Sequence, residues 1–115
     1  QILQAKLKSD PFEYINNQLP MAKRGELLSI ETADHYLNVT TDKGSHLVLM
    51  RFKDALKHLE HAPGLQVHRS WWVARKGVKD ILRADGKVSL KLQNDAIATV
   101  SRPNVKRLKE DGWLN

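Results

Sequence analysis

Short runs of branched and aromatic residues, separated by turn-forming residues, predict β-strands over most of the chain. From residue 26 to residue 50 these runs read LLSIE, HYLNVTT and HLVLM, with Thr-Ala-Asp and Asp-Lys-Gly between them. The Asp-Lys-Gly sequence supplies the glycine that a short hairpin loop needs for a positive φ. Strands near 36–41 and 45–50 are therefore expected to pair.

The second half of the chain continues in the same pattern. After residue 64 the runs read LQVHRS, WWVARKG, VKDILRAD, KVSLKLQ and AIATVS, and Asp85-Gly86 and Asn94-Asp95 mark tight turns between the last three. Beyond the first of these turns the residues alternate, with Val88, Leu90 and Leu92 on one face and Ser89, Lys91 and Gln93 on the other. Half-buried antiparallel strands are therefore expected.

Two segments show helical spacing instead. In FKDALKHL three apolar residues recur at i, i+4 and i+7, which predicts a helix of about three turns that begins at Met50 or Arg51. The His-Ala-Pro-Gly sequence at 61–64 ends this helix. A second, short helix is expected to start within 101–103, with Ser101 or Arg102 outside it and Pro103 in its first turn. Its inward-facing residues are predicted to be Val105, Leu108 and Trp113.

The order of these elements predicts a mostly β fold with one central helix and a short helical turn near the C-terminus. Strands and helices do not alternate regularly, so a doubly wound parallel sheet is not expected. Residues 1–25, punctuated by two prolines and a glycine, read as a linker plus a lead-in segment. We interpret residues 1–10 as a linker or cloning remnant and residues 11–115 as one domain. Because the chain begins at Gln1, it is expected to be a fragment of a longer protein.

Composition limits the classes of function. The 115 residues suit one domain with a modest core, and 41% hydrophobic and 28% charged residues are typical of a folded chain. The absence of cysteine excludes disulfides, thiolate–zinc sites and cysteine catalysis. No apolar run approaches the length of a membrane span, and the first twenty residues lack a signal-peptide core. A soluble, cytoplasmic protein is therefore expected.

The positive charge is unevenly distributed. Residues 1–62 carry eight Lys/Arg and eight Asp/Glu, whereas residues 63–115 carry eleven and five, so the second half holds the whole surplus of +6. A basic surplus confined to one part of a domain favours a polyanionic partner. A basic surface that merely keeps the protein in solution is the alternative.

The five histidines do not suggest catalysis or metal binding. His58 and His61 are spaced i, i+3, but no recognisable third ligand of a zinc site accompanies them. His68 and Ser70 would face the same way in a strand, and no glycine elbow exposes the serine as a nucleophile. The six glycines are scattered singly, so no phosphate-binding loop is present. The sequence therefore predicts neither an enzyme nor a cofactor site.

The stretch QVHRSWWVARKGV combines two adjacent tryptophans with several cations. Alternate residues of a strand point to opposite faces, so Trp71 and Trp72 are not both expected in one core. One ring should be buried and the other should flank the charged face. An aromatic ring beside arginine can also stack on the bases of single-stranded DNA or RNA, which makes a single-strand-binding β module the rival hypothesis.

Two cationic clusters favour phosphate contact over a merely hydrated surface. The first cluster lies at or near the ends of predicted strands, where loops can carry long side chains outward, and consists of Arg69, Arg75, Lys76 and Lys79. Of these, Arg75 and Lys76 are expected to contact DNA together with Arg69. The second cluster consists of Arg102, Lys106, Arg107 and Lys109. An interaction domain whose basic face meets an acidic protein is a third hypothesis.

Three stretches follow one another along the chain: SIETADHYLNVTTDKGSHLVLMRFKDALKHLE, GLQVHRSWWVARKGV and ATVSRPNVKRLKEDGWL. Together and in this order they resemble the LytTR family of bacterial DNA-binding domains. The I-E-x-x-x-x-Y-L motif, the basic-aromatic H-R-S-W motif and the final S-R motif appear in the family's order. The resemblance extends from Pro11 to Leu114.

The resemblance implies an elongated stack of small antiparallel sheets with one short helix. It also implies sequence-specific binding of duplex DNA through basic loops that enter successive major grooves. Members of the family commonly form the output domain of response regulators or membrane-linked transcriptional regulators. They often bind as two copies on tandem half-sites, so a homodimer on DNA and an upstream receiver or membrane sensor domain are expected.

Carried over by residue, the resemblance implies three base-reading loops. His35 is the candidate base contact of the first loop, in which Tyr36 is expected to be a core residue. Arg69 is the candidate base reader of the second loop, where His68 and Ser70 would orient the loop or meet phosphate.

In the third loop, Arg102 and Asn104 would reach a groove and Lys106 would contact a phosphate. Pro103 departs from the family pattern, because other members carry a longer, often basic or polar side chain there. A glycine and a proline that many members have before this loop correspond here to Asp95 and Thr99.

Overall fold

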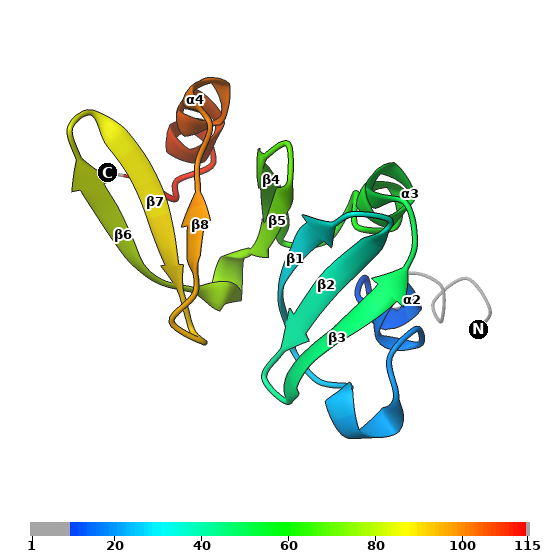
Figure 1. The fold of residues 1–115 in the computed structure, drawn as a ribbon. Coiled ribbons are helices and arrows are strands. Elements are labelled where there is room, and N and C mark those ends of the chain that lie inside the picture. The colour runs from blue at the N-terminus through cyan, green and yellow to red at the C-terminus, as the bar shows by residue number, and fades with distance from the viewer. Residues whose placement is uncertain (1–9, 115) are drawn as a thin grey trace, which may run out of the picture.

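The computed structural model describes residues 10–114. Within these residues, eight strands form two antiparallel sheets in a molecule of 49 × 30 × 23 Å (Figure 1). The five-stranded sheet has the order β3-β2-β1-β5-β4, with β1 (Leu27–Ala33), β2 (Tyr36–Thr41), β3 (Gly44–Leu49), β4 (Gly64–His68) and β5 (Trp71–Ala74). The three-stranded sheet has the order β6-β7-β8, with β6 (Val78–Ala84), β7 (Lys87–Leu92) and β8 (Ile97–Thr99). The helical elements are α2 (Glu13–Asn16), η1 (Met21–Lys23), α3 (Phe52–His58), η2 (Arg75–Gly77) and α4 (Arg102–Glu110). The predicted mostly β, elongated fold is confirmed.

The helices α2 and α3 cover one face of the five-stranded sheet and close a first core. Ile15 and Leu19 reach this core and are only 1% and 3% exposed. The lead-in segment expected before residue 26 therefore contributes to the first core through α2. The interpretation of residues 1–10 as a linker or cloning remnant falls, apart from Asp10, outside the described residues. A helix of four residues is too short to show apolar periodicity, which explains why the pattern missed it.

The β4–β5 hairpin joins this core to a second one. Because side chains alternate along a strand, Trp72 and Ala74 point into the first core, whereas Val73 points into the second together with Val67. The second core also contains apolar residues of β7, β8 and α4. The hairpin is therefore the middle layer of the molecule, buried on both faces.

The two tryptophans occupy different environments. Trp72 is 3% exposed, and its ring meets the edge of Phe12 with centroids 6.3 Å apart. Trp71 is half-buried and packs against the second core. The prediction that only one ring is fully buried is confirmed, and the other ring packs against the apolar residues of the second core.

The predicted turns are present. Asp85 and Gly86 have φ values of 53° and 76°, as a two-residue type I′ hairpin requires. Gly44, which ends the β2–β3 turn, has a φ of 129°, and Asp95 has a φ of 68°. Beyond the first turn, the predicted alternation in β7 is confirmed, because Val88, Leu90 and Leu92 are buried.

The helix α3 is shorter than predicted. It begins at Phe52, directly after Arg51, but spans seven residues, or about two turns rather than three. Leu59, the last apolar residue of the pattern, follows the helix and is still buried at 2% exposure.

The helix α4 is longer than the predicted helical turn. It spans nine residues, and Leu108 and Trp113 turn inward as predicted, with 0% and 7% exposure. Gly112 has a φ of 79°, and the Trp113 N–H donates to the Leu108 carbonyl over 2.8 Å. This Schellman arrangement ends the helix and directs Trp113 back to the core.

The prediction that Tyr36 belongs to the core is wrong. Its side chain is 44% exposed, because Tyr36 begins β2 opposite Leu49 on the sheet face that α2 and α3 leave uncovered. Its neighbour Leu37 occupies the inward position instead and is 2% exposed.

Gly77 connects β5 to β6 where the two sheets approach each other. A Cβ atom on this residue would lie 2.5 Å from the Leu28 carbonyl oxygen, a backbone atom that a side-chain rotation cannot remove. We expect Gly77→Ala to lower the free energy of unfolding by about 1–3 kcal/mol, as overpacking does. Urea denaturation measures this loss, with Lys76→Ala as the exposed neighbour that should change stability little. An unchanged midpoint for Gly77→Ala would contradict the close approach.

Candidate nucleic-acid interface

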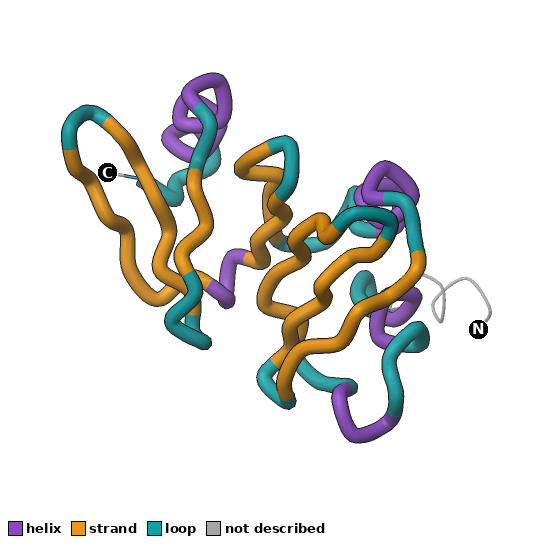
Figure 2. Tube along the Cα trace, viewed as in Figure 1, coloured by secondary structure: helices purple, strands orange, loops and turns teal. Residues whose placement is uncertain are grey.

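Three loops lie along one edge of the molecule, at the top in Figure 2. They are the β1–β2 turn (34–35), the β4–β5 turn (69–70) and the segment 101–104 between β8 and the first turn of α4. We call this side the loop edge. These are the three loops that the sequence resemblance singled out.

Backbone hydrogen bonds fix these loops as neighbours. The Thr32 N–H, near the end of β1, donates to the Ser70 carbonyl over 2.9 Å. The Ser101 N–H donates to the carbonyl of Val67 in β4, also over 2.9 Å. The second loop is therefore joined to the first on one side and to the third on the other.

The first loop is a tight turn closed by the pair Ala33 and Tyr36. Asp34 has a φ of 56°, a conformation that aspartate tolerates better than most residues. His35 follows it and is exposed. The turn therefore presents the His35 imidazole to solvent beside one carboxylate.

The second loop is stabilised by its own side chains. The Nδ1 atom of His68 lies 3.2 Å from the Ser70 backbone nitrogen and 2.9 Å from the Ser70 hydroxyl oxygen. Because a backbone N–H can only donate, Nδ1 is the acceptor of the bond from Ser70. Both half-buried side chains are thus engaged with each other, and Arg69 between them is exposed.

The third loop is anchored in a similar way. The Asn104 amide nitrogen donates to the Ser101 hydroxyl over 2.6 Å, and that hydroxyl lies 3.4 Å from the Val67 carbonyl. Arg102 is exposed, and Lys106 is exposed one helical turn later. Because residues four apart share a face of a helix, both cations point to the same side of α4.

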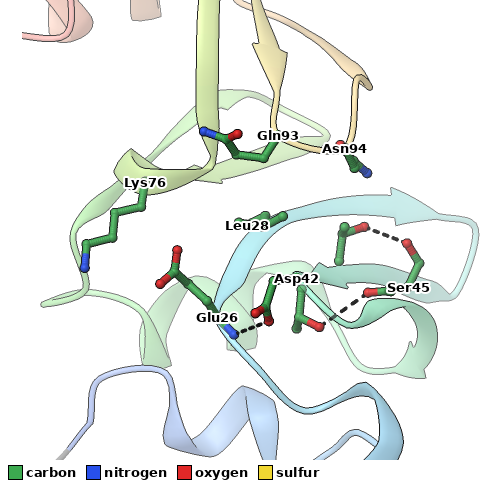
Figure 3. Close-up of a pocket in the computed structure, with 10 residues that line it drawn as sticks. Glu26, Leu28, Asp42, Ser45, Lys76, Gln93 and Asn94 are labelled. Atoms are coloured by element: carbon green, nitrogen blue, oxygen red, sulfur yellow. Dashed lines mark hydrogen bonds between the residues drawn. The ribbon is translucent and has the colours of Figure 1, made fainter.

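The structure does not bring Arg75 and Lys76 to the loop edge. Both belong to η2, and the four residues of β5 carry the chain about 13 Å from the 69–70 turn to the opposite edge. The Arg75 guanidinium lies 5.2 Å from the Trp113 ring centroid. Lys76 lines a cavity of about 520 Å³ with Glu26 and Asp42 (Figure 3). The sequence pattern correctly placed these cations at the end of a strand, but it could not show that this strand end lies at the edge opposite the loop edge.

Two exposed cations that sequence reasoning did not select lie at the loop edge. Arg51 lines a surface cavity together with His35, and Lys87 lines another together with Arg102. Arg51 belongs to the half of the chain without surplus charge, so the charge distribution gave no reason to choose it. The predicted pairing of β2 with β3 could have placed Arg51 beside the first loop, because it brings the end of β3 next to the start of β2.

The histidines of α3 and its end take no part in a ligand cluster. Among residues 10–114, no three His, Asp or Glu side chains gather where they could hold a metal ion. The ring of His58 stacks on Tyr14, with centroids 3.5 Å apart and planes 9° apart.

Within residues 10–114, no helix is both long enough and apolar enough to cross a membrane.

Comparison with solved structures defines the fold as that of LytTr DNA-binding domains. The LytTr domain of a Bacillus cereus protein described as a methyl-accepting/DNA response regulator superposes with a TM-score of 0.65 and 17% sequence identity. The alignment covers 80% of this chain and 83% of that chain.

Comparison with protein families gives the assignment of the chain itself. Residues 20–113 match the family of LytTr DNA-binding domains. The chain therefore belongs to the LytTR family, and the resemblance read from the three sequence stretches is confirmed. A search of curated proteins gave no match.

Proposed function

We propose that the chain is the DNA-binding output domain of a bacterial transcriptional regulator and that its loop edge faces the major grooves of duplex DNA. The observation that carries this proposal is the alignment of three loops, which carry His35, Arg69 and Arg102, along one edge of the β scaffold. The longest dimension of 49 Å matches about 14 base pairs of B-DNA. The edge can therefore reach two successive major grooves.

The geometry favours different roles for the residues of the edge. Arg69 and Arg102 are exposed and can form bidentate contacts with guanine, and His35 can donate to a base or a phosphate. His68, Ser70 and Asn104 are half-buried and bonded within their own loops, so we assign them to positioning. Lys106 contacts a phosphate in this arrangement. Arg75 and Lys76 receive no DNA contact because they lie at the other edge.

The rival function as a single-strand-binding module would need an aromatic ring free to stack on bases. Trp72 is fully buried, and Trp71 packs against the second core. Neither ring of the basic-aromatic stretch is therefore free to serve as a platform, which favours the duplex.

Family membership also supports proposals about the assembly. The Bacillus cereus domain is described as part of a response regulator. By analogy we propose a receiver or membrane sensor domain upstream of this chain, a cytoplasmic site of action and two copies on tandem half-sites.

Selection from random duplexes tests the proposed function. The chain should enrich a defined sequence motif, and an excess of single strands of the same sequence should not displace it at physiological salt. Enrichment without any motif, or displacement by single strands as strong as by duplex, would overturn the proposal.

The hydrogen bonds within the second loop lead to a testable prediction. We expect Ser70→Ala and His68→Ala each to weaken binding of the selected duplex by about 1 kcal/mol, or roughly fivefold, because the tip that carries Arg69 loses its restraint. His68→Asn, which can keep an acceptor near the Nδ1 position, should retain most of the affinity. Binding to random duplex should change little for all three variants. Equal losses on selected and random duplexes would instead indicate direct phosphate contacts.

A further inference from the structure

We propose that the DNA-contacting surface extends beyond the three loops at both ends of the loop edge, with Arg51 at one end and Lys87 at the other contacting backbone phosphates. This inference rests on the proposed function. It adds two residues that the family motifs do not select, and one of them, Arg51, lies outside the half of the chain that holds the charge surplus.

The position of Arg51 follows from strand pairing. Leu49, the last residue of β3, pairs with Tyr36, so the chain leaves the sheet directly beside the 34–35 turn. Arg51 then has extended backbone, with φ −76° and ψ 139°, and its side chain is exposed. It lines a surface cavity of about 470 Å³ together with His35. A phosphate close to His35 would therefore also be within reach of this guanidinium.

The position of Lys87 follows from the β6–β7 hairpin. Lys87 pairs with Ala84 and closes the turn that projects from the second sheet at the loop edge (Figure 1). Its side chain is exposed, and it lines a cavity of about 440 Å³ together with His68, Ser101 and Arg102. The third loop is therefore flanked by one more cation on the side away from the other loops.

Arg51 and Lys87 differ from two cations of the opposite edge. There, Lys79 and Lys91 form ion pairs with Asp95 over 3.3 and 3.8 Å. Arg51 and Lys87 take part in neither of these pairs. Their charges are therefore available for an external anion.

Carboxylates are also present at the loop edge. Asp54 lines the same cavity as Arg51, and Asp85 lies in the turn that Lys87 closes. Both are exposed, so each can remain in water while the neighbouring cation meets a phosphate. Repulsion from each carboxylate is expected to keep the phosphate on the side of the cation that faces away from that carboxylate.

The molecule is long enough to span one turn of a duplex. Its longest dimension is 49 Å, and the loop edge runs across both sheets (Figure 1). Successive major grooves on one face of B-DNA are about 34–36 Å apart. Contacts at both ends would therefore lie outside the grooves that the three loops enter, where the backbone borders them.

Salt-dependent binding of the full 115-residue chain to a labelled random-sequence duplex of about 20 base pairs tests the inference, because each phosphate contact contributes about 0.9 to the slope of log K against log salt. Arg51→Ala and Lys87→Ala should each reduce the slope by about that amount, whereas Arg51→Lys should keep it. Lys43→Ala is the matched control, an exposed lysine of a hairpin turn at the opposite edge, and should leave the slope unchanged. Circular dichroism should show that all four variants fold.

The outcomes separate this inference from the proposed function. If Arg51→Ala and Lys87→Ala behave like Lys43→Ala while Arg69→Ala still weakens binding of the selected duplex, the extension is wrong and the three-loop interface stands. A reduced slope in only one of the two variants overturns the contact at the other end. If the unmodified chain binds no duplex, the proposed function fails, and the extension fails with it.

Discussion

Replacement of Arg69 by alanine is expected to weaken binding of the selected duplex by about 1–3 kcal/mol and to relax the preference at one base position. Arg69 is exposed at the tip of a loop that the bonds between His68 and Ser70 hold in place, so the backbone that carries its guanidinium loses little conformational freedom on binding. Fluorescence anisotropy on a panel of duplexes with single base substitutions measures both effects. Arg69→Lys keeps the charge but loses the bidentate geometry, and should also relax the preference.

Lys106→Ala is the contrasting variant. This variant should lose a similar amount of binding affinity on all duplexes, because a phosphate contact carries no sequence information. Its slope of log K against log salt should be smaller by about one. If Arg69→Ala also weakened every duplex equally, Arg69 would be a phosphate contact. If it changed neither affinity nor preference, its assignment would be wrong.

Trp72→Ala is expected to lower the free energy of unfolding by about 3–5 kcal/mol. The Trp72 ring is 3% exposed in the first core, where it meets Phe12 and covers Gly64, so its removal leaves a large cavity. Since small domains are stable by only about 5–15 kcal/mol, the loss is a large share of the total. Thermal and urea unfolding, followed by circular dichroism, measure it.

Trp71→Ala is the matched control, since it removes the same side chain from the adjacent position. Trp71 is half-buried against the second core, so its loss should cost clearly less. Equal destabilisation by the two variants would contradict the assignment of the rings to different environments.

Local patterns predicted the local structure well. The alternation around Leu90 identified the buried face of β7, and Asp85-Gly86 identified the turn before it, because both signals depend only on neighbouring residues. The four residues of α2 gave no such signal, although Ile15 is among the most buried side chains. Tyr36 was misplaced because its burial depends on which sheet face the helices cover, which is a non-local property.

The candidate site was predictable only in part. The residues of the three loops were found through family motifs, but their alignment along one edge depends on the pairing of β1 with β5 and of Ser101 with Val67. Such pairing joins residues far apart in the sequence and leaves no local signal. For the same reason Arg75 was included although it lies at the opposite edge, and Arg51 was missed.

The central claim is that duplex DNA binds along the loop edge. Amide chemical-shift mapping by NMR of the chain with the selected duplex tests it most directly. The account predicts that the largest shifts occur at 34–35, 69–70 and 101–106 and that residues 42–43, 75–77 and 93–95 at the opposite edge change little. Shifts concentrated at the opposite edge, with the three loops unchanged, would contradict it.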